Sequence, residues 1–210
     1  MAPASATATE EIVFYHNPQS RSGMVHWMLE EAGVPYRVVP IDFTKGEHKT
    51  PSFLALNPMG KLPTITHRGV VVTETAAIIA YIADLVPEKG LAPKPSDALR
   101  GAYYRWLFFG AGCIEPALID KMMKRPEVER KSSVGWGSYE DVVATLKTTL
   151  AKGPYLLGET FSAADVYVGS EIRWAMMFGA PGFKGEKVFD DYLARMATRP
   201  VVQRLLAAAG

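Results

Sequence analysis

The sequence predicts an α/β domain followed by an all-helical domain, and three observations support this prediction. Short β-prone runs alternate with helical segments over residues 11–86. Residues 87–97 hold three prolines, which indicates an interdomain linker. Over residues 98–210 the apolar residues recur with helical period. With 48% hydrophobic residues, the chain can bury a substantial core in both domains.

The elements of the first domain follow from β-prone runs, helical spacing and turn residues. A run over residues 12–15 precedes a helical pattern that begins after Pro18 and is stopped by Gly33 and Pro35. The elements expected next are a strand over 36–41, a short helix over 52–56, strands over 64–67 and 70–73 around an Arg68-Gly69 turn, and a helix over 76–85. The resulting order, β-α-β-α-β-β-α, is that of a thioredoxin-like domain.

The second domain is predicted from three apolar stripes at helical spacing. These stripes cover residues 99–107, 139–150 and 188–196. Ser162 and Asp165 form a capping-box pattern at the start of a further helix. We therefore expect an all-helical bundle in which Asp165 has a structural role.

The composition argues against several classes of protein. The net charge is +1 without a basic block, which disfavours nucleic acid as a partner. No segment reaches the ~18 continuous apolar residues of a membrane span. A single cysteine, Cys113, excludes an intramolecular disulfide framework and fits a cytoplasmic protein. One cysteine and four scattered histidines form no metal-ligand cluster. Residues 1–10 lack the features of a secretory signal, and we expect a disordered leader there.

The segment Asn57–Ile65 is the most informative part of the chain. Pro63 stands where a strand begins, a position at which an X-Pro bond can be cis. Such a kink turns the main-chain N–H and C=O of Leu62 outward, where an extended ligand can pair as an extra strand. Glu74 and Thr75 then open an apolar helix, whose N-terminus suits a carboxylate while Glu74 suits an ammonium group. These features predict a site for a small peptide.

These residues resemble the glutathione-binding half of the cytosolic glutathione transferase superfamily. The segments Lys45–Lys49, Phe53–Pro58 and Gly60–Pro63 are similar to the theta-type, serine-type branch. Gly158–Asp165 resembles the buried helix start of the family's second domain. The resemblance covers nearly all of residues 11–210. It implies glutathione as co-substrate, no metal, a small hydrophobic electrophile as second substrate, and a homodimer.

The resemblance also implies a hydroxyl group that donates a hydrogen bond to the glutathione sulfur. The N-terminus of the first helix would further lower the pKa of that thiol. We favour Ser20 as this catalytic residue, with a one-residue shift against theta-type chains. Ser22 is the alternative, although its position is more typical of a first helical turn, and Tyr15 is more typical of a strand. Ser20 could instead simply cap the helix.

The glutathione-binding residues that the resemblance implies are Ser20, His48, Lys49, Leu62, Pro63, Glu74 and Thr75. His48 and Lys49 are expected at the glycine carboxylate, because this chain lacks the His-Lys pair that beta-type members carry after the Trp106 region. Their alternative is an ordinary solvated loop. Leu62-Pro63 could be only a structural turn, and Glu74-Thr75 only a helix cap.

The electrophile pocket is expected at Trp106, Phe109 and Cys113, with Trp174, Met177 and Phe178 as further candidates. For each of these residues the alternative is a role in the helical core. The expected function is a glutathione S-transferase of detoxification. Glutathione-dependent ether cleavage, dehalogenation, peroxidase activity and a non-catalytic glutathione-binding module are the alternatives, because a fold alone does not determine the reaction.

Overall fold

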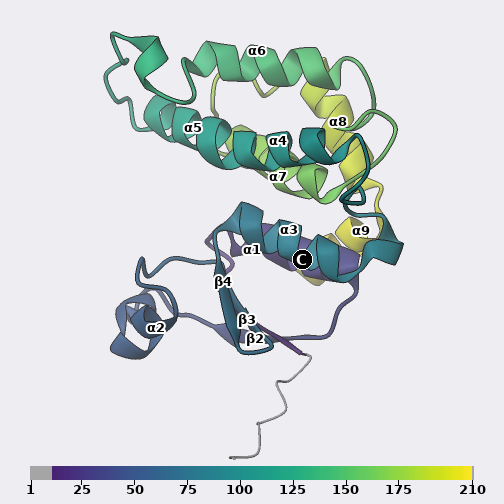
Figure 1. The fold of residues 1–210 in the computed structure, drawn as a ribbon. Helices are drawn as coiled ribbons and strands as arrows, with labels where there is room; N and C mark the ends of the chain where they lie inside the picture. Colours follow the sequence, from purple (N-terminus) through teal and green to yellow (C-terminus); the bar gives the residue numbers. More distant parts are fainter. Residues whose placement is uncertain (1–10, 210) are drawn as a thin grey trace, which may run out of the picture. The chain divides into compact units, whose positions relative to one another are not determined.

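The computed structural model of the chain describes residues 11–209 and divides between Val86 and Pro87 into two compact units. The first unit combines a mixed sheet with helices, and the second is built from helices (Figure 1). The predicted fold class is confirmed. The expected leader, residues 1–10, lies outside the described residues.

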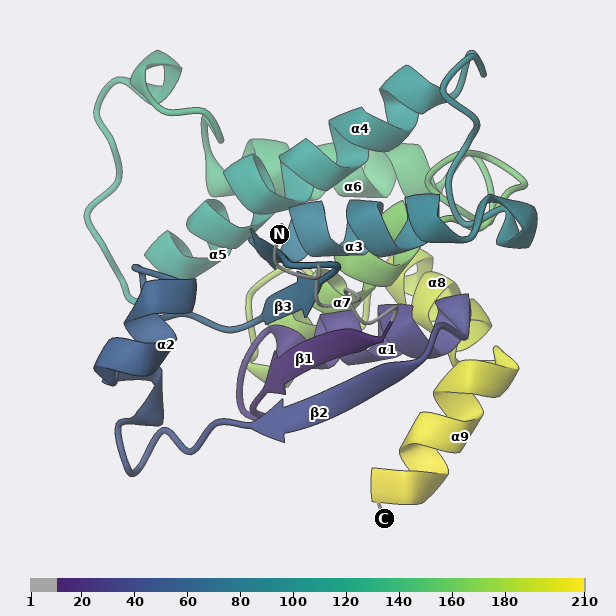
Figure 2. The same cartoon turned by 60° about the horizontal axis from the view of Figure 1, so that its bottom comes forward.

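The first unit contains a four-stranded sheet in the order β2-β1-β3-β4. β1 (Ile12–His16) pairs in parallel with β2 (Tyr36–Pro40) and antiparallel with β3 (Thr64–His67). β3 pairs antiparallel with β4 (Val70–Thr73). Figure 2 shows β1 between β2 and β3. The sheet is therefore mixed, as the element order predicts.

Three α-helices accompany this sheet. They are α1 (Ser22–Ala32), α2 (Pro51–Leu56), which follows the short 3-10 helix η1 (Glu47–Lys49), and α3 (Thr75–Leu85). α1 and α3 pack against each other. α1 ends at Gly33, whose φ of 64° is the left-handed conformation that glycine adopts without steric cost. The predicted stop signal is therefore confirmed.

Alternate residues of β1 face the two sides of the sheet, as the period of a strand requires. Phe14 is buried opposite Ile65 of β3, and its ring centroid lies 6.2 Å from that of His26 on α1. The Tyr15 ring meets the ring of Phe53 on α2 edge-on, with 5.7 Å between centroids. α1 thus covers one face of β1, and α2 covers the other.

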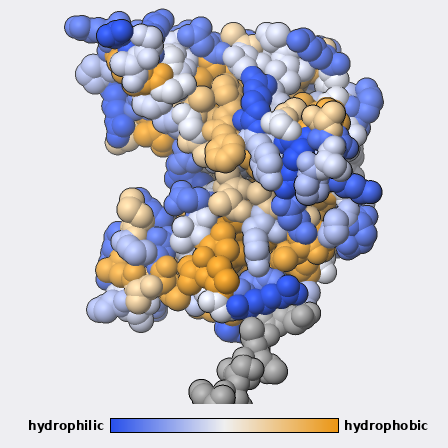
Figure 3. Space-filling view, in the orientation of Figure 1, coloured by the Kyte–Doolittle hydropathy of each residue, from blue (hydrophilic) through white to orange (hydrophobic). Residues whose placement is uncertain are grey.

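The outer strand β4 presents apolar side chains at the surface. Val70 is 56% exposed and Val71 is 38% exposed. Hydrophobic surface is visible over this strand in Figure 3. β4 is therefore an apolar edge of the sheet, and its bounds agree with the hairpin predicted around Arg68-Gly69.

The second unit is helical, apart from two isolated β-bridges over residues 155–160. Its helices are η2 (Pro87–Lys89), α4 (Arg100–Phe109), η3 (Gly110–Ile114), α5 (Glu115–Met122), η4 (Lys131–Ser133), α6 (Tyr139–Leu150), α7 (Ala163–Met177), α8 (Lys187–Ala197) and α9 (Pro200–Ala209). The three predicted stripes correspond to α4, α6 and α8. Leu99 departs from its stripe, because it is exposed and precedes α4. Within residues 11–209, no helix combines the length and the apolar character needed to cross a bilayer.

α4, η3 and α5 follow one another without a break, and η3 is a π-helical turn. The turn begins at Gly110, where α7 approaches closely. A Cβ atom at this position would lie 2.5 Å from Cε1 of Tyr167 on α7. Only glycine therefore permits this packing of the two helices.

The start of α7 is fixed by the buried carboxylate of Asp165. Its Oδ1 accepts hydrogen bonds from the Leu156 N–H at 2.9 Å and from the Tyr192 hydroxyl at 3.0 Å. Its Oδ2 accepts from the Ser162 N–H at 2.9 Å and from the Ser162 hydroxyl at 3.1 Å. All four donors are satisfied by one side chain, which supports the structural role expected for Asp165.

Asp165→Ala is expected to lower the free energy of unfolding by roughly 3 kcal/mol or more, because it leaves several buried donors without an acceptor. The matched control is Ser138→Ala, which removes the Ser138 Oγ that accepts from the Asp141 N–H at the start of α6. That cap should contribute only about 1 kcal/mol. Urea unfolding of both variants measures the difference, and equal losses would contradict the role assigned to Asp165.

Candidate functional site

The first unit contains a cavity of about 330 Å³. The loop between β1 and α1, the η1 segment and the turn before β3 enclose it. Its lining residues are Gln19, Ser20, Arg21, Phe43, His48, Lys49, Gly60, Lys61 and Leu62. Among the described residues that line it, four are basic and none is acidic. The cavity therefore favours a ligand with negative charge.

The cavity brings together four of the residues predicted from the sequence. These are Ser20, His48, Lys49 and Leu62. The other three, Pro63, Glu74 and Thr75, do not line it. Pro63 directly follows Leu62 in the chain, whereas Glu74 and Thr75 lie at the start of α3.

Glu74 and Thr75 lie at the start of α3. Glu74 is exposed and has φ 67° and ψ 121°, a conformation that a residue with a Cβ rarely adopts. Thr75 is the first residue of the helix, one position before the predicted start. Glu74 makes no side-chain cap bond to the first turn of α3.

Sequence reasoning missed five lining residues: Gln19, Arg21, Phe43, Gly60 and Lys61. Arg21 and Lys61 give no signal in the sequence, because charged loop residues are usually solvated. Gly60 does carry one, since glycine in a turn often marks a left-handed conformation or a close approach of main chains.

The loop before α1 holds Ser20 at the cavity through its own main chain. The Ser20 hydroxyl donates to the Asn17 carbonyl at 2.8 Å, and Ser20 Oγ accepts from the Ser22 N–H at 3.1 Å. The Asn17 side chain anchors the loop to the end of β2, because its Nδ2 donates to the Ile41 carbonyl at 2.8 Å. Ser20 therefore presents its hydroxyl to the cavity from an ordered loop.

The three hydroxyl residues of the loop and strand differ in where their side chains lie. Ser22 is fully buried, so its hydroxyl does not reach the cavity. Arg21 directly precedes α1 and makes no side-chain cap bond, while Ser20 Oγ accepts a hydrogen bond from the N–H of Ser22, the first residue of the helix. Tyr15 is a strand residue that packs on Phe53, as its position predicts. Of the three hydroxyl residues, only Ser20 lines the cavity.

His16, the last residue of β1, lies behind Ser22. Its Nδ1 is 2.7 Å from Ser22 Oγ. Burial, and secondarily the charge of the nearby His26, lower the pKa of His16 from 6.5 to about 4. The imidazole is therefore neutral at pH 7.

His48 enters the cavity from η1, and the aromatic ring of Phe43 holds it. The two rings meet edge-on with 4.9 Å between centroids. Its Nδ1 is buried and has no hydrogen-bond partner among the described residues. Because an unpaired N–H there would be costly, the ring proton belongs on Nε2. His48 can then donate one hydrogen bond to a ligand.

The turn before β3 depends on the buried amide of Asn57. Asn57 Nδ2 donates to the Lys61 carbonyl at 3.0 Å, and Asn57 Oδ1 accepts from the Met59 N–H at 3.1 Å. The Leu62-Pro63 bond that follows is cis, in agreement with the sequence analysis. Within residues 11–209, no hydrogen bond engages the main-chain N–H or C=O of Leu62. These two groups remain available for an extended ligand.

η1 and this turn are in contact at Gly60. The Lys49 ammonium donates to the Met59 carbonyl at 3.0 Å. A Cβ atom at Gly60, whose φ is 61°, would lie 2.7 Å from both the His48 carbonyl oxygen and Lys49 Nζ. Glycine at this position therefore sets how closely His48 and Lys49 approach Leu62.

The residues expected at an electrophile pocket lie on α4 and η3. Trp106 is only 2% exposed, and the Arg105 guanidinium lies 3.8 Å from its ring centroid. Phe109 is half-buried beside it, with 5.5 Å between ring centroids. The Cys113 thiol donates to the Gly135 carbonyl at 3.4 Å, and burial raises its pKa. Cys113 is therefore poorly suited to act as a nucleophile.

Trp174, Met177 and Phe178 lie at the end of α7. Met177 and Phe178 are exposed, and the Phe178 ring meets the Trp174 ring edge-on. These three residues and the three on α4 and η3 do not line the cavity of the first unit.

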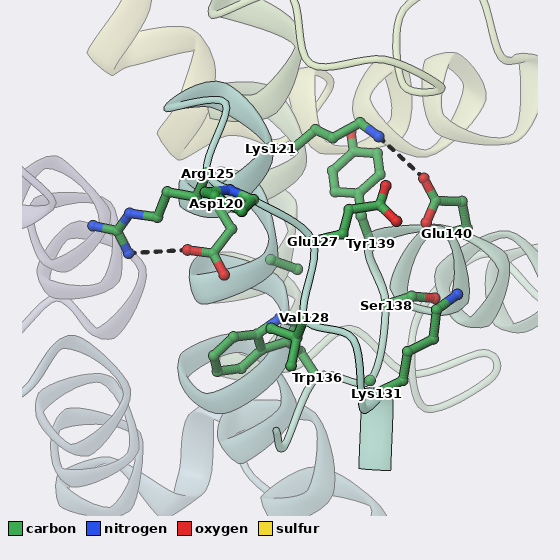
Figure 4. Close-up of a pocket in the computed structure, with 13 residues that line it drawn as sticks. Asp120, Lys121, Arg125, Glu127, Val128, Lys131, Trp136, Ser138, Tyr139 and Glu140 are labelled. Carbon is green, nitrogen blue, oxygen red and sulfur yellow. Dashed lines mark hydrogen bonds and ion pairs between the residues drawn. The ribbon is translucent and has the colours of Figure 1, made fainter. Parts of the chain in front are cut away.

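A second cavity, of about 60 Å³, lies in the helical unit between α5 and α6 (Figure 4). Charged side chains line it and pair with one another. Arg125 contacts Asp120 at 2.9 Å, and Lys121 contacts Glu140 at 3.2 Å. Its size and its internal pairing make it a poor site for a peptide. Across residues 11–209, no group of three His, Cys, Asp or Glu side chains is placed to hold a metal ion.

Comparison with known proteins matches this chain to glutathione S-transferases. Residues 10–84 match the model of the glutathione S-transferase N-terminal domain family. The chain is 27% identical over 198 residues to glutathione S-transferase GstA of Escherichia coli O157:H7, covering 93% of this chain and 98% of that protein. It is 30% identical over 149 residues to glutathione S-transferase F9 of Arabidopsis thaliana, and the match covers 66% of this chain and 68% of that protein.

A solved structure of a sphingomonad glutathione S-transferase complexed with glutathione is also similar. It is 28% identical, with a TM-score of 0.76, and the match covers 93% of this chain and 98% of that chain.

Gly60→Ala tests the close approach of η1 to the turn. Gly46→Ala is the matched control, because Gly46 has a similar φ of 68° but no atom within 4 Å of the added Cβ. The control should cost about 1 kcal/mol for its left-handed conformation. Gly60→Ala should cost about 1–3 kcal/mol more, because a main-chain oxygen blocks the methyl group. Urea unfolding measures both, and equal costs would contradict the proposed contact.

The free energy of unfolding should fall as the pH is lowered from about 6.5 to about 4. In this window His16 takes up a proton in the unfolded chain but not in the folded one, so protonation favours unfolding. Above this window both states are neutral at His16, and the contribution is constant. His16→Asn should flatten the pH dependence of urea unfolding. An unchanged slope would show that His16 is not the group responsible.

Proposed function

Because the chain belongs to the cytosolic glutathione S-transferase family, we propose that it binds glutathione in the cavity of its first unit. The protein is a glutathione transferase, with glutathione as co-substrate. The observation that most supports this location is the convergence of Ser20, His48 and Leu62 on one cavity with a basic lining.

The charge of the cavity fits the ligand. Glutathione is a tripeptide with two carboxylates, one ammonium group and one thiol. The lining supplies Arg21, His48, Lys49 and Lys61. In the proposed complex the His48 Nε2–H donates to the glycine carboxylate, and the Lys49 ammonium lies beside it. Charge-assisted hydrogen bonds of this kind are stronger than neutral ones.

The main chain of Leu62 supplies the second set of contacts. Its unpaired N–H and C=O can pair with the cysteine residue of glutathione as a short extra strand. Pro63 fixes the direction of the chain there. Glu74 and Thr75, at the start of α3, would receive the γ-glutamyl end of the ligand. The N-terminus of α3 suits its carboxylate, and the Glu74 side chain suits its ammonium group.

Ser20 is the proposed catalytic residue. Its hydroxyl would donate a hydrogen bond to the sulfur and stabilise the thiolate, while the N-terminus of α1 adds the effect of its dipole. The thiolate then attacks a small apolar electrophile, and proximity and preorganised charge supply the rate enhancement. Under this proposal the chain is a serine-type, theta-like member of the family.

The second substrate and the assembly are also proposals. Phe109 and Cys113 are partly exposed, whereas Trp106 is buried. We propose that these three residues contribute to the electrophile pocket. We propose a cytoplasmic homodimer that acts in detoxification, on the basis of the family to which the chain belongs.

Ser20→Ala tests the proposed function. Loss of a hydrogen bond to a charged sulfur, worth about 1.5–3 kcal/mol, should raise the pKa of the bound thiol by roughly 1–2 units. The pH profile of kcat/KM with an aryl chloride should shift upward by the same amount, while the dissociation constant for glutathione stays nearly constant. The control is Ser52→Ala, on α2 outside the cavity lining.

An unchanged pH profile in Ser20→Ala would remove Ser20 from the mechanism. Binding of glutathione by the unaltered protein without turnover of any electrophile would instead indicate a non-catalytic binding module.

A further inference from the structure

We propose that His16 and Ser22 are positioning residues that direct the hydroxyl proton of Ser20 into the cavity. This inference rests on the proposed role of Ser20 at the glutathione sulfur. The three side chains form one continuous chain of polar contacts at the end of β1 and the start of α1. His16 Nδ1 lies 2.7 Å from Ser22 Oγ, and Ser22 Oγ lies 2.7 Å from Ser20 Oγ.

Ser20 has one hydroxyl proton and a competing acceptor inside the loop. The Asn17 carbonyl oxygen lies 2.8 Å from Ser20 Oγ. If the Ser20 hydroxyl keeps donating its proton to that carbonyl, only the lone pairs of Ser20 Oγ face the cavity. These lone pairs repel a thiolate. A hydroxyl that stabilises the thiolate must therefore give up the inward bond when the ligand binds.

Ser22 provides a substitute for that inward bond. Ser22 Oγ donates to the same Asn17 carbonyl at 2.9 Å and accepts from the Asn17 N–H at 3.1 Å. The Ser22 N–H donates to Ser20 Oγ at 3.1 Å. Ser20 Oγ is thus held in place without using its own proton. When Ser20 turns outward, the Asn17 carbonyl keeps the Ser22 hydroxyl as a donor, together with the Ser20 N–H at 3.1 Å.

The position of the His16 proton determines whether Ser22 Oγ can also accept a hydrogen bond from the Ser20 hydroxyl. A hydroxyl oxygen has two acceptor lone pairs. On Ser22 one lone pair accepts from the Asn17 N–H, and a proton on His16 Nδ1 occupies the other. Ser20 then cannot donate to Ser22, and its choice is between the Asn17 carbonyl and the ligand. A thiolate is charged and is the stronger acceptor of the two.

The opposite imidazole tautomer would have the opposite effect. An unprotonated Nδ1 of His16 would accept the Ser22 proton, and the Ser20 hydroxyl would then be the hydroxyl that donates to the Asn17 carbonyl. Ser20 would then be held inward. The direction of the His16 hydrogen bond therefore determines how readily Ser20 serves the sulfur.

The surroundings of His16 favour one neutral, ordered ring. The ring centroid of Phe14 lies 5.0 Å away and that of His26 lies 5.6 Å away. The Nε2 atom of His26 in turn lies 2.9 Å from the Tyr36 hydroxyl, which donates to Glu30 at 2.6 Å. The lowered pKa of His16, about 4, keeps the ring neutral with a single N–H at pH 7. The proposal places this N–H on Nδ1, 2.7 Å from Ser22 Oγ.

The test measures the pKa of the bound glutathione thiol from its thiolate absorbance in Ser20→Ala, His16→Phe, His16→Asn and Ser22→Ala, together with the unfolding free energy of each variant. His16→Phe and Ser22→Ala should raise this pKa by about half a unit, which is about threefold less thiolate below the pKa. His16→Asn should restore most of the effect, because its amide N–H can take the place of Nδ1–H.

The matched control is His67→Phe. His67 is a buried histidine of the first unit, with Nδ1 2.8 Å from the Tyr81 hydroxyl. Its loss should lower stability without changing the thiol pKa. Because Ser22 is buried and Ser22→Ala can lose stability, the pair His16→Phe and His16→Asn decides the question without it.

The inference is overturned if Ser20→Ala raises the thiol pKa while a folded His16→Phe does not, or if His16→Asn raises it as much as His16→Phe. If Ser20→Ala itself leaves the thiol pKa unchanged, the proposed role of Ser20 fails, and this inference fails with it. Ser20→Ala therefore distinguishes failure of the proposed role of Ser20 from failure of the positioning role of His16 and Ser22 alone.

Discussion

The cavity of the first unit depends on one buried side chain, the amide of Asn57. Its carboxamide satisfies main-chain groups on both sides of the turn that leads into β3. It also lies 3.2 Å from the Thr64 hydroxyl, at the first residue of that strand. This anchoring holds Gly60 against η1 and Leu62 at the edge of the cavity. A buried amide with satisfied bonds specifies a single conformation, because any other leaves polar groups unpaired.

The basic lining follows from this same geometry. Lys49 is fixed by the carbonyl of the turn, and His48 by the ring of Phe43. Neither side chain is neutralised by an acidic residue of the lining. The structural elements thus hold positive groups, a serine hydroxyl and free main-chain groups of Leu62 around one space. A tripeptide with charged ends and a central thiol uses all three.

The sequence was sufficient where local rules decide the structure. The bounds of β3 and β4 agree with prediction because the Arg68-Gly69 turn fixes the register, and Gly33 ends α1 as expected. It was insufficient where burial decides. Ser20 and Ser22 are two residues apart, and only the tertiary structure shows that one faces the cavity while the other is enclosed. Arg21 was missed for a similar reason, since only the fold brings its loop to η1. The π-helical turn at Gly110 was missed because it interrupts the helical period.

The most direct test of this account is a titration of the isotopically labelled protein with glutathione, followed by backbone amide chemical shifts. The account predicts the largest changes at Ser20, Arg21, His48 and Leu62, with further changes at the start of α3. Changes confined to the cavity between α5 and α6, or no saturable changes at millimolar glutathione, would contradict it.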